Sequence, residues 1–172
     1  RYGSKTKTLR PLLSEHGLIK SRVMIEVLWV QKLISKLKLV DETELELIQT
    51  KLKKIIKDFD KEAGEAVKAL ERSTNHDVKA VEYYLRDNFK IDGVLNQLIP
   101  YIHFGCTSED INNLAHSTML KEARDCFILP SLQSLSNHLR LLANRFATIG
   151  MLSRTHGQPA TPTTMGKEIA NF

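Results

Sequence analysis

The chain has 172 residues, of which 42% are hydrophobic and 26% charged, and its formal net charge is +5 at pH 7. This composition is that of a globular protein with a substantial core and argues against disorder, and the length favours one domain or slightly more. The 25 Lys and Arg residues and the 20 Asp and Glu residues are interspersed, and no basic stripe is interleaved with aromatic residues. The slight basic surplus therefore suits a small anionic substrate as well as it suits nucleic acid.

The two cysteines, Cys106 and Cys126, have neither metal-ligand nor redox spacing, which predicts free thiols in a reducing compartment. The longest apolar runs are far short of a membrane span, and no signal-peptide pattern occurs. We therefore expect a cytoplasmic protein without a membrane partner. The chain begins at Arg1 without Met and ends in what reads as the first turns of a helix, so we expect a piece of a longer protein.

Apolar residues recur every three or four positions along much of the chain, which is typical of amphipathic helices. The first such stripe predicts a helix over about 14–37. Cap candidates at 41–43 precede a second stripe, which predicts a helix over about 45–72 that Gly64 could interrupt.

A heptad-like seam follows Pro130, which either kinks a helix or starts a new one. Its members are Leu132, Leu135, Leu139, Leu142 and Phe146. The seam predicts a long helix in a bundle, with His138 outside the seam on the surface. No stretch alternates as a strand does, so we predict an all-α fold with five or six helices and loops near 73–77, 100–107 and 149–162.

The first polar loop is a run of five polar residues at 73–77, directly before helical spacing resumes. It places Asn75, His76 and Asp77 at a helix N-terminus, where free N–H groups and the helix dipole favour an anion. A helix cap with no further role explains the same residues. The neighbouring His and Asp keep a binding role open.

The second polar loop leads into a helix through Thr107 and Asp110, which fit a capping box. Hydroxyl and backbone N–H groups would face whatever docks at this helix start. Capping boxes are common, however, so this pattern alone requires no ligand. Asn112, Asn113 and His116 make the beginning of the helix more polar than a plain core helix needs.

The third polar loop, 153–162, contains an imidazole, a guanidinium, an amide and several hydroxyls. Gly157 permits unusual backbone angles, and two prolines prevent a helix from continuing. This collection of groups suits a site that handles protons and carboxylates. A polar connector with a hydrogen-bonded His156 is the alternative.

Three stretches together resemble a known family: Ser-Arg-Thr-His-Gly-Gln-Pro-Ala-Thr-Pro (153–162), Thr-Asn-His-Asp-Val-Lys-Ala-Val-Glu-Tyr (74–83) and His-Phe-Gly-Cys-Thr-Ser-Glu-Asp-Ile-Asn-Asn (103–113). They are similar to signature stretches of the adenylosuccinate lyase family, within the fumarase/aspartase superfamily. The resemblance runs from the first residue to the last. It implies an N-terminal helical domain over 1–99 and the first part of a central helical bundle over 100–172.

The resemblance also implies an activity. The family cleaves adenylosuccinate to AMP and fumarate, and the related succinyl-aminoimidazole carboxamide ribotide to its carboxamide ribotide and fumarate, by β-elimination without a metal or organic cofactor. It forms homotetramers whose active sites are each assembled from three subunits. Its catalytic base is a Ser on a mobile Ser-Ser-x-Met-Pro loop, and no such loop occurs in these 172 residues. The chain alone is therefore expected to be inert.

Carried over by position, His156 is the acid that protonates the leaving nitrogen. Other matching positions are implied to bind the phosphate and the succinyl carboxylates of the substrate: Arg1, Tyr2, Asn75, His76, Asp77, Thr107 and Ser108. His103 matches a family histidine close to the phosphate, and Thr155 and Gln158 flank the acid.

Two alternatives remain open. One is another fumarate-releasing lyase of the same superfamily with a different succinyl substrate. The other is a non-catalytic helical interaction module that binds nucleic acid through its basic surplus, which would show salt-dependent binding. The second alternative leaves the three histidine-bearing loops without a function.

Overall fold

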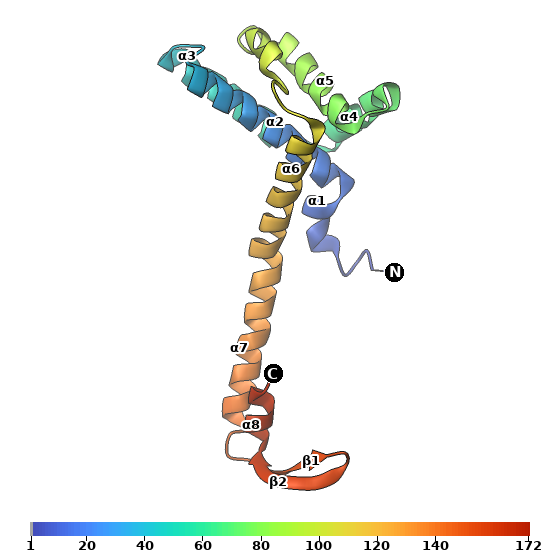
Figure 1. The fold of residues 1–172 in the computed structure, drawn as a ribbon, viewed down its shortest axis with the longest axis vertical. Helices are drawn as coiled ribbons and strands as arrows, with labels where there is room; N and C mark the ends of the chain where they lie inside the picture. The colour runs from blue at the N-terminus through green and yellow to red at the C-terminus, as the bar shows by residue number, and fades with distance from the viewer. Residues whose placement is uncertain (1) are drawn as a thin grey trace. The chain divides into compact units, whose positions relative to one another are not determined.

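The computed structural model describes residues 2–172, and its helices, hairpin and termini are drawn in Figure 1. The chain divides into two compact units, Arg1–Ala123 and Arg124–Phe172. This division lies later in the chain than the predicted domain boundary between residues 99 and 100, which remains a prediction. The fold class is all-α, as predicted, with one small sheet in the second unit.

The first unit is built from helices. In order they are the 3-10 helix η1 (Lys7–Leu9), α1 (Arg10–Leu13), α2 (Glu15–Leu37), α3 (Glu42–Lys57), α4 (Lys61–Thr74), α5 (Asp77–Lys90), the 3-10 helix η2 (Leu95–Tyr101) and α6 (Ser108–Ala123). The predicted start of α2 is confirmed, because the Ser14 hydroxyl accepts a hydrogen bond from the Gly17 N–H at 3.1 Å. Asp41 caps α3 in the same way, through the Glu44 N–H at 2.8 Å.

The prediction of one helix over 45–72 is wrong, because α3 ends and α4 begins within it. The chain turns at 58–60, Phe59 enters the core with 3% of its surface exposed, and the Asp60 carboxylate accepts a hydrogen bond from the Ala63 N–H at 2.9 Å. Gly64 lies inside α4, where a Cβ would overlap the His16 ring. The apolar spacing continues across the turn because both helices bury the same kind of face.

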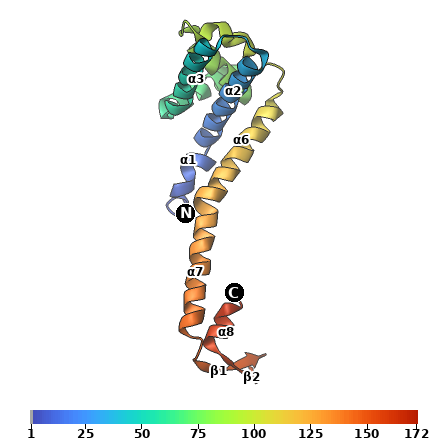
Figure 2. The same cartoon turned by 90° about the vertical axis from the view of Figure 1, so that its left-hand side faces the viewer.

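The core of this unit is centred on α2, which lies beside α3 and α6 (Figures 1 and 2). Its fully buried Val23, Val27 and Val30 belong to a cluster that also holds residues of α3, α5 and η2. A smaller buried cluster joins α2, α5 and α6, and consists of Ile25, Val78, Ile111 and Ala115. The second cluster fixes the beginnings of α5 and α6 on α2.

The second unit consists of the π-helical turn η3 (Arg124–Ile128), α7 (Leu129–Arg145), the strands β1 (Gly150–Thr155) and β2 (Gln158–Thr164), and α8 (Met165–Ala170). Pro130 lies in the first turn of α7, but the backbone before it is already helical, because η3 runs directly into α7 and Ile128 has φ −71° and ψ −55°. Pro130 therefore does not start a separate helix, and the alternative of a kink remains a prediction. Gly166 of α8 packs so closely on α7 that a Cβ would overlap the Ala143 carbonyl oxygen.

The predicted loop at 149–162 is instead largely an antiparallel hairpin. Gly150 pairs with Thr164 and Thr155 with Gln158, with an irregularity between Leu152 and Arg154. Prolines predict an interruption of regular structure, but a two-stranded sheet consists of edges only, and an edge strand tolerates a proline that makes no ladder hydrogen bond. The strands therefore form despite a sequence that shows no alternation.

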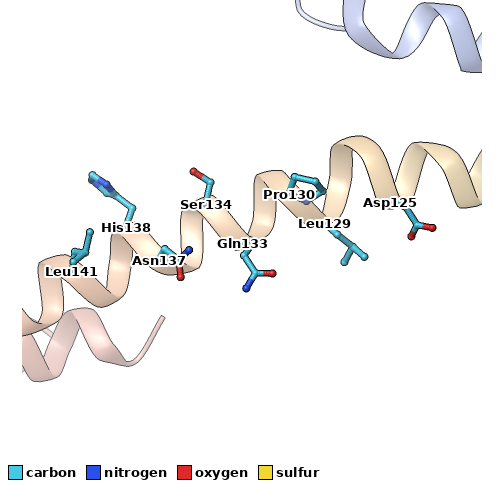
Figure 3. A pocket seen from close by; sticks show the side chains of 8 residues that line it. All are labelled: Asp125, Leu129, Pro130, Gln133, Ser134, Asn137, His138 and Leu141. Carbon is cyan, nitrogen blue, oxygen red and sulfur yellow. The ribbon is translucent and has the colours of Figure 1, made fainter.

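The predicted seam on α7 is not buried within this unit. Leu132 and Leu135 are each 56% exposed. Figure 3 shows the side chains that line a pocket of this unit; Asp125 comes from η3 and the others, His138 among them, from α7. His138 is exposed, as predicted, whereas packing of the seam in a bundle remains a prediction. Among the helices of residues 2–172, none combines the length and apolarity that crossing a membrane requires.

Candidate functional site

Arg22 of α2 joins the starts of two helices, α5 and α6, each of which follows one of the predicted polar loops. Its Nη2 donates to Asp77 Oδ2 at 2.6 Å and its Nε donates to Asn112 Oδ1 at 2.9 Å. The Arg22 side chain is 8% exposed and that of Asp77 is 45% exposed. One planar guanidinium, with donors in a fixed fork, thus holds the first residue of α5 and the second turn of α6 at a set separation.

Asp77 is held by more than this ion pair. Its Oδ1 accepts a hydrogen bond from the Val78 N–H at 2.8 Å. Burial raises the pKa of Asp77, but the Val78 hydrogen bond and the charge of Arg22 outweigh burial and leave the pKa below its usual value. Asp77 is therefore a carboxylate at neutral pH, with each oxygen already engaged by the protein.

The predicted loop residues cap the start of α5, whereas their role in binding an anion remains a prediction. His76 is the N-cap, and its Nδ1 accepts a hydrogen bond from the Lys79 N–H at 3.2 Å. Because Nδ1 accepts, the neutral ring carries its proton on Nε2, and the side chain is half exposed. Asn75 precedes it in the left-handed region, with φ 50°, and is exposed. These neighbours therefore present an amide and an imidazole N–H at one helix N-terminus.

The start of α6 also follows the prediction in part. The Asp110 carboxylate accepts a hydrogen bond from the Thr107 N–H at 2.7 Å, which is one of the two bonds of a capping box. Thr107 is exposed and Ser108 is half-buried. Since Asn112 is tied to Arg22, this helix start and that of α5 belong to one local arrangement in the first unit.

His103 lies in the loop before α6 and is bound to a second charged residue of α2. The Glu26 carboxylate, with 0% of its side chain exposed, lies 2.6 Å from His103 Nδ1 and also accepts the His103 backbone N–H at 3.1 Å. His103 is in the left-handed region, with φ 60°. Burial raises the pKa of Glu26, although the hydrogen bonds and charge of His103 act in the opposite direction.

The loop around His103 has a third anchor on α2. Trp29 donates its Nε1–H to the Phe104 carbonyl oxygen at 2.8 Å. Arg22, Glu26 and Trp29 are spaced by four and three residues, so they lie along one face of α2. That single face positions both polar loops of the first unit.

The third polar loop belongs to the second unit, where His156 and Gly157 form the two-residue turn of the hairpin. Their φ angles are 51° and 79°, and positive φ at both positions is typical of a type I′ turn. Arg154 donates to the Gly157 carbonyl oxygen at 3.3 Å across the turn. His156 and its flanking residues Thr155 and Gln158 are exposed, so the turn offers an accessible imidazole.

The remaining predicted positions lie at the N-terminus. Tyr2 is 62% exposed, and its carbonyl oxygen accepts hydrogen bonds from the backbone of Lys5 and Thr6. Arg1, a predicted substrate-binding residue, lies outside the described residues. Within residues 2–172, no group of three or more His, Cys, Asp or Glu side chains is placed to hold a metal ion.

Sequence reasoning missed Arg22 and Glu26. Both lie in an apolar helical stripe and were covered by the prediction of a core helix. The available signal was two opposite charges four residues apart inside that stripe, because charges that are fully buried are almost always paired. Their partners lie 55 to 90 residues further along the chain, so the sequence alone could not identify them.

The fold and the loops define a class of protein. A family described as lyase matches residues 1–172, and the chain belongs to this family. Among curated relatives, the adenylosuccinate lyase of Escherichia coli (strain K12) is 49% identical over 173 residues, and that of Vibrio cholerae (strain O395) is 46% identical over 172 residues. Each match covers 99% of this chain but 38% of the relative. The chain thus spans well under half the length of the curated relatives it matches.

Solved structures of more distant proteins share the fold. The fumarate lyase from Mesorhizobium sp. BNC1 is similar with a TM-score of 0.73 at 22% identity, over 96% of this chain and 36% of that one. The 3-carboxy-cis,cis-muconate lactonizing enzyme from Pseudomonas putida gives a TM-score of 0.71 at 21% identity, with the same coverage. At this level of identity the similarity concerns the fold alone.

Proposed function

We propose that the protein to which this chain belongs is an adenylosuccinate lyase. It would release fumarate by β-elimination from adenylosuccinate, giving AMP, and from the succinyl-aminoimidazole carboxamide ribotide. The observation that carries the proposal is identity of 46–49% with adenylosuccinate lyases over nearly the whole chain. The position of the predicted site residues at two adjoining helix starts and a hairpin turn is compatible with it.

The chemistry requires a base, an acid and a stabilised carbanion. A base removes the proton beside a carboxylate, electrons move to expel the nitrogen, and an acid protonates that nitrogen as it leaves. The intermediate gathers negative charge, so fixed N–H donors and cations around it lower the barrier. We propose that side chains at the starts of α5 and α6 serve this purpose, and we assign substrate binding to Asn75, His76, Asp77, Thr107 and Ser108.

We assign the acid to His156, with Thr155 and Gln158 beside it. An imidazole surrounded by anions stays protonated near neutral pH, as a general acid must. The turn leaves the His156 ring accessible, because the residue is exposed at the tip of the hairpin. We further assign Arg1, Tyr2 and His103 to the binding of the substrate's anionic groups.

The base is not assigned within this chain. The family resemblance places it on a Ser-rich loop that these 172 residues lack, so the chain alone should not turn over substrate. We also propose that the protein is a cytoplasmic homotetramer with shared active sites, without nucleic acid as a partner. The two cysteines, neither of them in a disulfide, are compatible with a reducing compartment.

The test is a lyase assay of the full-length protein and its His156→Ala variant. We expect the variant to lose at least about a hundredfold in kcat, as is usual for loss of a general acid, while it still binds substrate. Turnover near that of the wild type would refute the role of His156. Turnover of another succinyl compound in place of both purine ribotides would instead identify a different lyase of the superfamily.

A further inference from the structure

Among the pairs of a carboxylate with a basic side chain in residues 2–172, that of Glu26 and His103 is the one whose carboxylate has no exposed surface. A carboxylate without access to water is costly unless its oxygens are satisfied. Both Glu26 oxygens are satisfied by one residue, because Oε1 meets His103 Nδ1 and Oε2 accepts the His103 backbone N–H. The ring and the main chain of His103 are therefore clamped by the same carboxylate.

We propose that Glu26 is a positioning residue for substrate binding. Its carboxylate holds His103 through a proton shared between Glu26 Oε1 and His103 Nδ1. This leaves His103 Nε2 as the ring atom that contacts an anionic group of the substrate. This inference rests on the proposed function, since it concerns the same site. Glu26 is not assigned to that site by any resemblance of the loops, because it lies 77 residues away from His103 in the sequence.

The position of the proton between Glu26 and His103 follows from which of their atoms can donate and which can accept a hydrogen bond. The backbone N–H can only donate, so Oε2 carries no proton toward it. The 2.6 Å separation of Oε1 and Nδ1 requires one proton between them, and an ionised Glu26 places it on Nδ1. A ring held in this way can accept a second proton only at Nε2. Such a proton would be stabilised by an anion bound there, with the Glu26 carboxylate on the opposite edge of the ring.

The backbone makes the clamp necessary. His103 has a positive φ of 60°, which an L-residue adopts at a cost, and Gly105 follows with a φ of 70°. The loop therefore requires external contacts to hold its shape. Glu26 supplies two of them and Trp29 a third, all from the rigid helix α2. His103 keeps 19% of its side chain exposed, which leaves the ring accessible from one side.

Glu82 offers a matched control. It is a carboxylate of α5 whose side chain is 4% exposed, and Lys79 and Arg86 bind it at 2.7 Å and 2.8 Å. Glu82 acts on the pKa of Glu26 through its charge but makes no hydrogen bond to His103. Glu82→Gln thus removes a buried carboxylate charge from the same unit but leaves both hydrogen bonds between Glu26 and His103 in place.

The experiment compares Glu26→Gln, Glu82→Gln, His103→Ala and the Glu26→Gln/His103→Ala double variant in the full-length protein. The amide of Glu26→Gln keeps the shape but has one acceptor oxygen for two N–H groups. We expect its KM to rise about tenfold, as for loss of a hydrogen bond to a charged group, with kcat within about twofold. In the His103→Ala background the same change should alter KM by less than about twofold, since the two residues act as a unit.

A second measurement does not depend on turnover. Proton NMR of the full-length protein should show a downfield Nδ1–H signal that disappears in His103→Ala, moves in Glu26→Gln and stays in place in Glu82→Gln. Additive effects on KM, or an Nδ1–H signal unchanged by Glu26→Gln, would overturn the proposal. If the wild-type protein turned over no succinylated purine ribotide, the proposed function would fail, and the NMR signal would still decide the assignment of Glu26.

Discussion

Replacement of Arg22 should weaken the packing of two helix starts, those of α5 and α6, at the same time. Replacement by Met keeps much of the apolar stem and removes the guanidinium that binds Asp77 and Asn112. A hydrogen bond to a charged group contributes about 1.5–3 kcal/mol. The bond to Asp77 contributes less, because that side chain is 45% exposed and water can replace the lost partner. Met also avoids the cost of burying a charge.

Together these terms predict that Arg22→Met weakens the docking of α5 and α6 on α2 by about 2 kcal/mol. This change in free energy concerns local opening of α5 and α6, so amide hydrogen exchange should detect it. Its measurement does not depend on a two-state unfolding transition of the whole protein. We expect amides in the first two turns of α5 and α6 to exchange about thirtyfold faster in the full-length variant. Lys32→Met is the matched control, because Lys32 is an exposed cation of the same helix.

Three outcomes would refute this reasoning. Unchanged exchange at both helix starts would mean that the apolar cluster around Ile25 and Val78 suffices to dock them. Equal acceleration in Lys32→Met would mean that loss of any charge on α2 has the same effect. Faster exchange at α5 alone would show that the bond to Asn112 contributes nothing, and that the joint hold on the two helices is wrong.

Two further predictions concern stability. The hydrogen bond from Lys51 keeps the pKa of Asp92 below its usual value. The stabilisation by Asp92 should therefore be complete above about pH 5 and disappear as the pH falls through the lowered pKa. Urea titrations of wild type and Asp92→Asn should thus differ by a constant amount above about pH 5 and converge in acid, and a difference that grew in acid would contradict the sign. At Gly157, φ is 79° with open space around the Cβ position, so Gly157→Ala should destabilise the hairpin by about 1 kcal/mol through backbone strain alone. Gly157→Asn should be close to neutral in the same hairpin exchange measurement, and equal losses for both would show that the turn does not depend on left-handed geometry.

Local signals determined how well the helices could be predicted. Ser14, Asp41 and His76 cap helices at or next to their predicted places, because a cap acts over three residues and is visible in any short window. The turn at 58–60 was missed for the opposite reason. Periodicity is a signal averaged over many residues, and Phe59 fits the apolar stripe whether the helix continues or stops. Asp60, which caps α4, was the local signal that a new helix begins.

The hairpin was missed because its strands have no alternation to read. Most residues of both strands are exposed on both faces, so no buried face imposes a period of two. What specifies the hairpin is the turn at His156 and Gly157, whose polar composition by itself predicts only a loop. The prediction of an unusual backbone at Gly157 is confirmed by its positive φ, while its consequence, a pair of strands, was not recognised.

The candidate site was predictable in its polar loops and not in what holds them. The loops that contain His76, His103 and Thr107 can be predicted from their composition, since their polar residues at helix starts differ clearly from the apolar stripes on either side. The residues that hold these loops lie on α2 and give no such signal. They are charged residues within an apolar stripe, and the periodicity of that stripe predicts a core helix without them. Because Arg22 and Glu26 each bind residues that are distant in sequence, the shape of both loops depends on the packing of α2. Under the proposed function, a change in α2 that contacts no substrate should therefore alter substrate binding through the shape of these loops.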